Sequence, residues 1–123
     1  RTSRWRFVLS NSELLSQSES VDWSQAIAAL LGQNELIWED TDKKGRPRRR
    51  DLRDLLQDLR LLEQLEPCSE EISSRAELEL IAAVDSQGRS LKPAQLQFWL
   101  SQSLGFDLSL SRVRRVELTL LQC

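Results

Sequence analysis

The order in which apolar residues recur along this chain is the feature that most limits its fold. Stretches in which every second residue is apolar are typical of half-buried strands, whereas a recurrence every three or four residues is typical of amphipathic helices. The strand-like stretches are 4–10, 35–41, 76–84 and 113–121, and the helical stretches are 22–32 and 93–105. The predicted order is therefore strand, helix, strand, insertion, strand, helix, strand.

The two predicted helices carry recognisable start and stop signals. Asp22 is a typical N-cap, with Gln25 three residues later as in a capping box, and Gly32 marks the end of this helix. Pro93 suits the first position of the second helix, which Gly105 ends. The apolar stripes of the two helices consist of Trp23, Ile27, Leu30 and Leu31 and of Leu96, Trp99, Leu100 and Leu104.

This order predicts an α+β domain with the ferredoxin-like βαββαβ arrangement. Right-handed crossovers then give an antiparallel sheet with both helices on one face. The first and third strands are expected at the centre, and the first is also expected beside the fourth. The first strand would place Trp5, Phe7 and Leu9 on the face of the sheet that the helices cover. On the uncovered face, Arg4 and Arg6 would lie across from Glu77, Glu79 and Glu117.

The insertion is predicted to contain a basic hairpin. Residues 42–45 read as a turn, and 46–50 would return as a ribbon that Pro47 restricts to a sheet edge. Residues 51–62 fit either a short capped helix or a turn that leads into a strand. We favour one helical turn followed by extended chain from about Asp58. Residues 63–75 read as an acidic loop.

The composition is that of one globular domain. The chain has 123 residues, of which 40% are hydrophobic and 29% charged. No apolar run approaches the roughly 20 residues that a transmembrane helix needs, so no membrane partner is expected. The chain contains no Met. We therefore interpret residues 1–123 as a single accessory domain, a fragment of a longer protein, in a cytoplasmic setting.

The sequence offers no catalytic or metal-binding set of residues. It contains no His, which removes Ser–His and Cys–His catalysis and His-based metal sites. Cys68 and Cys123 lie 55 positions apart and are expected to be free thiols. Paired carboxylates such as Glu70 and Glu71 fall in charged or loop segments, where solvation is the simpler explanation. We expect no catalytic residue, no metal and no cofactor in this fragment.

One segment stands out by its charge. Residues 43–53 contain seven basic residues and one acidic residue, whereas the rest of the chain contains ten basic and eighteen acidic residues. Such density attracts phosphate backbones, but it also fits a solvated hairpin tip or a surface that docks on an acidic partner. The candidate nucleic-acid-binding or docking residues are Lys43, Lys44, Arg46, Arg48, Arg49, Arg50 and Arg53.

Four short motifs in a fixed order resemble a known family. They are Lys43-Lys44-Gly45, Asp51-Leu52-Arg53, the run from Gly88 to Pro93, and the run from Val113 to Leu118. Together they resemble, over about residues 21–121, the C-terminal part of the domain of unknown function found in radical SAM-linked proteins. The resemblance implies a parent chain or partner enzyme with a [4Fe–4S] cluster and S-adenosylmethionine. That enzyme's three-cysteine motif is absent here.

The favoured function is therefore a non-catalytic accessory domain of a radical SAM-linked protein, which positions an RNA substrate through the basic loop. The alternative is a structural or protein-interaction domain that docks to the radical SAM enzyme or to the rest of the parent chain. The four tryptophans, Trp5, Trp23, Trp38 and Trp99, occur at core periodicity and are expected to be buried rather than to stack on bases. The loop itself contains no aromatic residue, so it would contact phosphates and not read bases.

Overall fold

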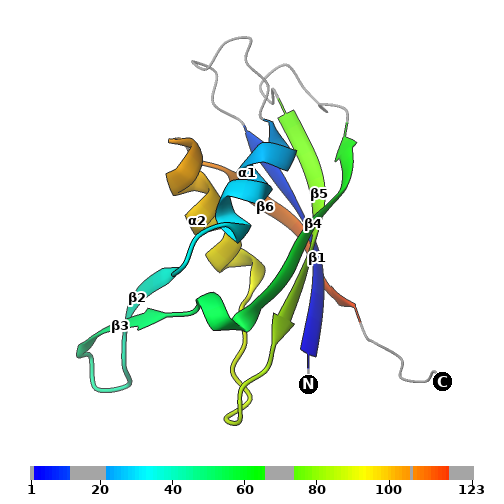
Figure 1. Ribbon diagram of the computed structural model, residues 1–123. Helices are drawn as coiled ribbons and strands as arrows, with labels where there is room; N and C mark the ends of the chain where they lie inside the picture. Colours follow the sequence, from blue (N-terminus) through cyan, green and yellow to red (C-terminus); the bar gives the residue numbers. More distant parts are fainter. Residues whose placement is uncertain (1, 12–21, 66–73, 106, 117–123) are drawn as a thin grey trace, which may run out of the picture.

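The computed structural model describes residues 2–11, 22–65, 74–105 and 107–116, and Figure 1 shows their arrangement. In chain order the elements are β1 (Thr2–Asn11), α1 (Trp23–Leu31), β2 (Ile37–Thr41), β3 (Pro47–Asp51), a 3₁₀ turn η2 (Arg53–Leu55), β4 (Leu56–Leu65), β5 (Ser74–Ala83), α2 (Pro93–Leu104) and β6 (Ser109–Val116).

The main sheet has the topology that the sequence predicts. Its four strands lie in the order β4-β5-β1-β6, and every neighbouring pair is antiparallel. Both helices lie on the same side of this sheet (Figure 1). The central strands are the first and the third of the four, and the first also pairs with the last. The ferredoxin-like α+β prediction is confirmed.

The core lies between the helices and one face of the sheet. Phe7 and Leu9 on β1 are fully buried, as are Leu78 and Leu80 on β5. From the helices, Leu30 and Leu96 close the same cluster and are also inaccessible to solvent. Burying each such side chain contributes about 1.5–3 kcal/mol relative to leaving it exposed. This shared core fixes both helices on the sheet.

The helix ends follow the local signals. Asp22 Oδ1 accepts the Gln25 backbone N–H at 3.1 Å, which satisfies one of the free donors at the start of α1. Gly105 ends α2 in the left-handed region, with φ of 85°, and its N–H donates to the Ser101 carbonyl. The helix predictions are confirmed at both ends.

The prediction for the second sheet strand is wrong. Residues 37–41 do not join the main sheet; β2 pairs only with β3 in a separate two-stranded sheet. After Ile37 and Trp38, β2 has no further apolar residue that could enter the core. Leu56 and Leu59 of β4 are buried instead, opposite Ala82 and Leu80 of β5. The leucine-rich segment is therefore the true second strand.

Around the insertion, the structure resolves the alternatives left open by the sequence. One 3₁₀ turn, η2, is followed by extended chain that begins at Leu56, close to the expected Asp58. The acidic loop predicted for 63–75 is shorter than expected, because β4 continues to Leu65 and β5 begins at Ser74. The remainder of that loop lies outside the described residues. The predicted return of residues 46–50 as a ribbon is confirmed, with β3 shifted by one residue to Pro47–Asp51.

The open face of the sheet carries a buried carboxylate. Arg6 Nε donates to Glu79 Oε2 at 3.1 Å, and Arg4 Nη1 lies 3.9 Å from the same oxygen. Glu77 pairs with Arg114 at 3.4 Å. The predicted pairing of Arg4 and Arg6 is confirmed for Glu79, which is only 3% exposed rather than solvated, but not for Glu77, whose partner is Arg114. Glu117 lies outside the described residues.

The fourth strand begins earlier than predicted. Its observed start is Ser109 rather than Val113, and the predicted residues 117–121 lie beyond the described part of the chain. None of the helices in the described ranges is long and apolar enough to cross a membrane. Within the same ranges, no three Cys, Asp or Glu side chains gather as metal ligands do. Neither cysteine falls in those ranges.

Candidate functional site

The predicted basic loop forms a hairpin that projects from the body of the domain. In Figure 1, β2 and β3 extend away from the helices and the main sheet. Their register places Trp38 opposite Arg50 and Asp40 opposite Arg48. Because side chains alternate along a strand, these four residues share one face of the hairpin, and Arg49 lies on the other.

The hairpin tip is built on one aspartate. Asp42 Oδ1 accepts the backbone N–H groups of Lys44 and Arg46, each at 2.9 Å, and Asp42 Oδ2 accepts from Arg46 Nε at 3.2 Å. Gly45 occupies the left-handed region, with φ of 81°, as the turn requires. The backbone hydrogen bonds, from Arg46 first, hold the pKa of Asp42 below its ordinary value. The turn thus keeps this carboxylate ionised.

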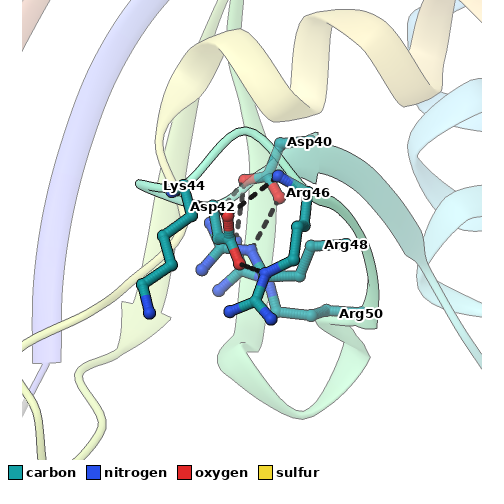
Figure 2. A network of polar contacts seen from close by, with 6 residues as sticks. All are labelled: Asp40, Asp42, Lys44, Arg46, Arg48 and Arg50. Carbon is teal, nitrogen blue, oxygen red and sulfur yellow. Dashed lines mark hydrogen bonds and ion pairs between the residues drawn. The ribbon is translucent and has the colours of Figure 1, made fainter.

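Two arginines of the hairpin share a second carboxylate. Arg48 binds Asp40 through Nε and Nη2, at 2.9 and 3.0 Å, and Arg50 Nη2 donates to the same group at 3.1 Å. The hydrogen bond from Arg48 lowers the pKa of Asp40. Figure 2 shows the side chains of Arg46, Arg48 and Arg50 gathered around the two aspartates. These three residues, with Trp38 beyond Arg50, form what we call the arginine face of the hairpin.

The remaining basic residues of the hairpin are more exposed. Arg49 Nε lies 3.6 Å from Glu39 Oε2, and the side chains of these two residues are 66% and 73% exposed. Lys43 and Lys44 are exposed at the tip, and neither ammonium group forms an ion pair with a residue that the structure describes. In Figure 2 the Lys44 side chain extends away from the aspartates. The tip therefore offers two exposed cations to a ligand.

The whole hairpin carries a lower net charge than residues 43–53 alone, because strand pairing places the acidic residues of β2 beside the arginines. The hairpin from Ile37 to Asp51 contains six basic and four acidic residues, for a net charge of +2. Three of the acidic residues, Glu39, Asp40 and Asp42, belong to β2 or the turn after it and lie beside the arginines. The hairpin is a dense array of both signs with a modest positive excess.

Arg53 stands apart from the other candidate residues. Its Nε donates to the Gln33 carbonyl at 2.9 Å, its Nη2 to the Leu31 carbonyl at 2.8 Å and its Nη1 to the Leu56 carbonyl at 3.0 Å. Leu31 is the last residue of α1, so Arg53 satisfies carbonyls that the end of a helix leaves free. The guanidinium ties α1 to the start of β4, and this fixes the base of the hairpin.

Replacing Arg53 with alanine is expected to lower the free energy of unfolding by about 1.5–3 kcal/mol, because it removes hydrogen bonds made by a charged group. The matched control is Arg49→Ala, whose side chain is 66% exposed and which should change stability by about 0.5 kcal/mol or less. Denaturant unfolding of both variants measures the difference. If both substitutions lowered the free energy of unfolding equally, the structural role of Arg53 would be contradicted.

A cleft of about 790 Å³ lies at the base of the hairpin. Trp38 and Arg50 of the arginine face line it on one side, and Arg89 and Lys92 line it from the segment between β5 and α2. The other lining residues come from the chain around η2 and from the segment that leads into the first turn of α2: Asp51, Leu52, Asp54, Leu55, Asp85, Gly88, Ser90, Ala94 and Gln95.

The turn on the far side of the cleft repeats the hairpin tip. Asp85 Oδ1 accepts the backbone N–H groups of Gln87 and Arg89 at 2.9 and 2.8 Å, and Asp85 Oδ2 lies 3.4 Å from Arg89 Nε. Gly88 has the same positive φ, 81°, as Gly45. The backbone donors, from Arg89 first, lower the pKa of Asp85 as those of the hairpin turn lower that of Asp42. Both turns have the sequence Asp-x-x-Gly-Arg and project from the same end of the molecule (Figure 1).

The comparisons with known proteins identify a family. Residues 1–93 match the model of the family described as "Uncharacterized protein conserved in bacteria (DUF2344)". The chain belongs to this family. The DUF2344 match includes the basic hairpin, Arg53 and the second Asp-x-x-Gly-Arg turn, and it ends at the first residue of α2. No curated protein and no solved structure matches the chain significantly.

Sequence reasoning found the basic residues of this DUF2344 domain but missed the other wall of the cleft. In the sequence analysis, Arg89 and Lys92 occur only within one of the motifs on which the family resemblance rests. No role was predicted for either residue. The signal in the sequence was the repeat of Asp-x-x-Gly-Arg at 42–46 and 85–89. Trp38 was expected to be buried. Trp23 and Trp99 are buried, but Trp5 and Trp38 are only partly so, and Trp38 lines the cleft.

Proposed function

We propose that this domain is a non-catalytic accessory of a radical SAM-linked protein and that its hairpin positions an RNA substrate through contacts to phosphates. The observation that supports this most directly is the concentration of six basic residues on a short hairpin that stands clear of the core. Arg presents a planar set of donors that fits phosphate oxygens, and Lys adds a point charge. The two exposed lysines at the tip are the first groups that an approaching polyanion would meet.

The carboxylates of the hairpin weaken such binding without preventing it. Exposed ion pairs such as Arg46–Asp42 and Arg49–Glu39 contribute little to stability, so a phosphate can replace a carboxylate as partner. Release of counterions from the nucleic acid adds to the attraction at low salt. The expected binding is therefore weak, steep in its salt dependence and tolerant of sequence.

We assign the radical SAM chemistry to the rest of the parent chain or to a partner enzyme, and not to this domain. A [4Fe–4S] cluster of the radical SAM type needs three cysteine thiolates, and this chain has only two cysteines. The residues present do not fit the cluster, so neither it nor S-adenosylmethionine is placed in this domain. The proposed accessory role is to hold the substrate.

The proposal is tested by fluorescence anisotropy of a labelled single-stranded RNA titrated with the isolated chain. We expect saturable binding at low salt that weakens as salt is added, with a slope of log affinity against log salt of about 0.7 for each phosphate contact. Absence of binding at low salt would contradict the RNA-binding role.

A second function is favoured by one specific observation. Phe98 of α2 is 44% exposed and packs edge-on against Trp38, with ring centroids 5.4 Å apart, beside Arg49. Exposed aromatic residues with arginine are enriched at protein interfaces, so this side of the hairpin also suits docking to the radical SAM enzyme or to the rest of the parent chain. Docking predicts binding to that protein by the isolated domain, which Phe98→Ala would weaken.

A further inference from the structure

The cleft between the base of the hairpin and the second Asp-x-x-Gly-Arg turn has no role in binding through the hairpin alone. We propose that it holds one unpaired nucleotide of a single-stranded RNA, with the base against Trp38 and the flanking phosphates on Arg50, Arg89 and Lys92. This inference rests on the proposed RNA-binding function and deepens it, because it adds a second wall and a contact to a base.

The arginine face of the hairpin leads directly into the cleft. Arg48 and Arg50 lie two residues apart on β3 and therefore point to the same side, and Arg50 is opposite Trp38 in the register. Arg50 and Trp38 both line the cleft. A strand of RNA that follows Arg46, Arg48 and Arg50 from the tip therefore arrives at the indole ring.

The opposite wall supplies cations for the next phosphate. Arg89 has a side chain that is 50% exposed and lies at the second turn. Lys92 is exposed and forms no ion pair with any residue in the described ranges. The spacing of phosphates along a flexible single strand lets successive groups meet the two walls. Phosphate binding on both walls distinguishes a groove from a single charged hairpin.

The acidic residues that line the cleft are mostly engaged elsewhere. Asp51 Oδ1 accepts the backbone N–H groups of Leu36 and Arg53 at 2.9 and 3.0 Å. Asp85 accepts the N–H groups of its own turn. These two carboxylates have backbone partners but remain ionised, so the cleft lining carries three cations, Arg50, Arg89 and Lys92, against three carboxylates. Asp54 is the one lining carboxylate with no hydrogen-bond donor among the described residues, and Lys92 lies in the same lining to offset its charge.

Trp38 is held in place for stacking. Its ring packs edge-to-face against Phe98 and Trp99, with centroids 5.4 and 6.1 Å away, so it does not need to be ordered when a base binds. Proteins that bind single strands combine such aromatic rings with a basic groove. The volume of about 790 Å³ falls within the range of roughly 300–1,000 Å³ typical of ligand sites. A nucleotide fits this space, whereas a duplex does not expose an unpaired base to the ring.

The test uses two probes, a short oligouridine and an inorganic polyphosphate, with three variants of the chain. Trp38→Leu removes the ring, Trp38→Phe keeps an aromatic ring and guards against misfolding, and the double variant Arg89→Ala/Lys92→Ala removes the far wall. The matched control is Arg114→Ala/Arg115→Ala on β6, which lies at the far edge of the sheet from β4.

For oligouridine, Trp38→Leu should weaken binding by about 5- to 150-fold, the range found when one base–aromatic stack is removed. Trp38→Phe should retain most of the affinity, and neither substitution should change the salt slope. Arg89→Ala/Lys92→Ala should weaken binding of both probes and flatten the slope by about 0.7 for each phosphate that the variant no longer contacts. Polyphosphate binding should be insensitive to Trp38→Leu, and the β6 control should have little effect on either probe.

Equal affinity of wild type and Trp38→Leu for oligouridine would overturn the stacking proposal while leaving phosphate binding by the hairpin intact. If the Arg89→Ala/Lys92→Ala variant binds both probes as tightly as the wild type, the proposed phosphate binding by the second wall would be overturned. If the wild type binds neither probe at low salt, the RNA-binding function fails, and the cleft proposal fails with it.

Discussion

Replacing Trp99 with alanine is expected to lower the free energy of unfolding by about 3–5 kcal/mol, as deletions of large aromatic side chains from cores do. Trp99 is only 5% exposed and lies in the core cluster on α2. Its indole Nε1 also donates to the Ile37 carbonyl at 2.9 Å, which joins α2 to the start of the hairpin. The substitution therefore leaves both a cavity and an unsatisfied carbonyl. Denaturant unfolding followed by circular dichroism measures the change.

The adjacent residue provides a matched control for this prediction. Phe98 is also aromatic and lies on α2, but it is 44% exposed. Phe98→Ala removes mainly its edge-to-face contact with Trp38, so it should lower the stability by about 0.5–1.5 kcal/mol. If both substitutions lower the stability equally, Trp99 does not have the core position described above.

Removing four arginines from the hairpin is expected to abolish nearly all RNA binding. The variant Arg46→Ala/Arg48→Ala/Arg49→Ala/Arg50→Ala changes the net charge of the hairpin from +2 to −2, because its four acidic residues remain beside only two lysines. A hairpin with that charge repels phosphates rather than attracting them. None of the four side chains belongs to the core, so the main sheet and both helices should remain folded.

A second quadruple variant separates this effect from a general reduction of charge. Alanine at Arg60, Arg112, Arg114 and Arg115 removes the same charge from β4 and β6 of the main sheet. Its circular dichroism and RNA affinity should stay close to those of the wild type. Comparable decreases of affinity in the two variants would mean that RNA responds to net charge and not to the hairpin.

The helices and the sheet topology could be predicted because their signals are local. The Asp22 cap, Pro93 and Gly105 act within a few residues of their own helix. The second strand was misassigned because period-two alternation at 35–41 does not reveal which strand it pairs with. In the true strand region, Leu52, Leu55, Leu56 and Leu59 recur with helical spacing, so periodicity alone left this region ambiguous between a helix and a strand.

The candidate site was predictable in composition but not in its contacts. A charge count over 43–53 finds the arginines, yet Asp40 and Glu39 lie outside that window and reach the arginines only through strand pairing. The capping role of Arg53 depends on the end of α1, which lies more than twenty residues earlier in sequence and next to it in space. No local pattern reports such a contact. The cleft likewise appears only once the fold brings the base of the hairpin beside the second turn.

The central claim, that the hairpin holds RNA through phosphates, is tested most directly by the salt dependence of single-stranded RNA binding in wild type and the hairpin quadruple variant. For the wild type, we predict a log–log salt slope of about 0.7 per phosphate contact. The variant is predicted to bind too weakly to measure even at low salt while keeping the circular dichroism of the wild type. Equal affinities and slopes for the two proteins would contradict the claim.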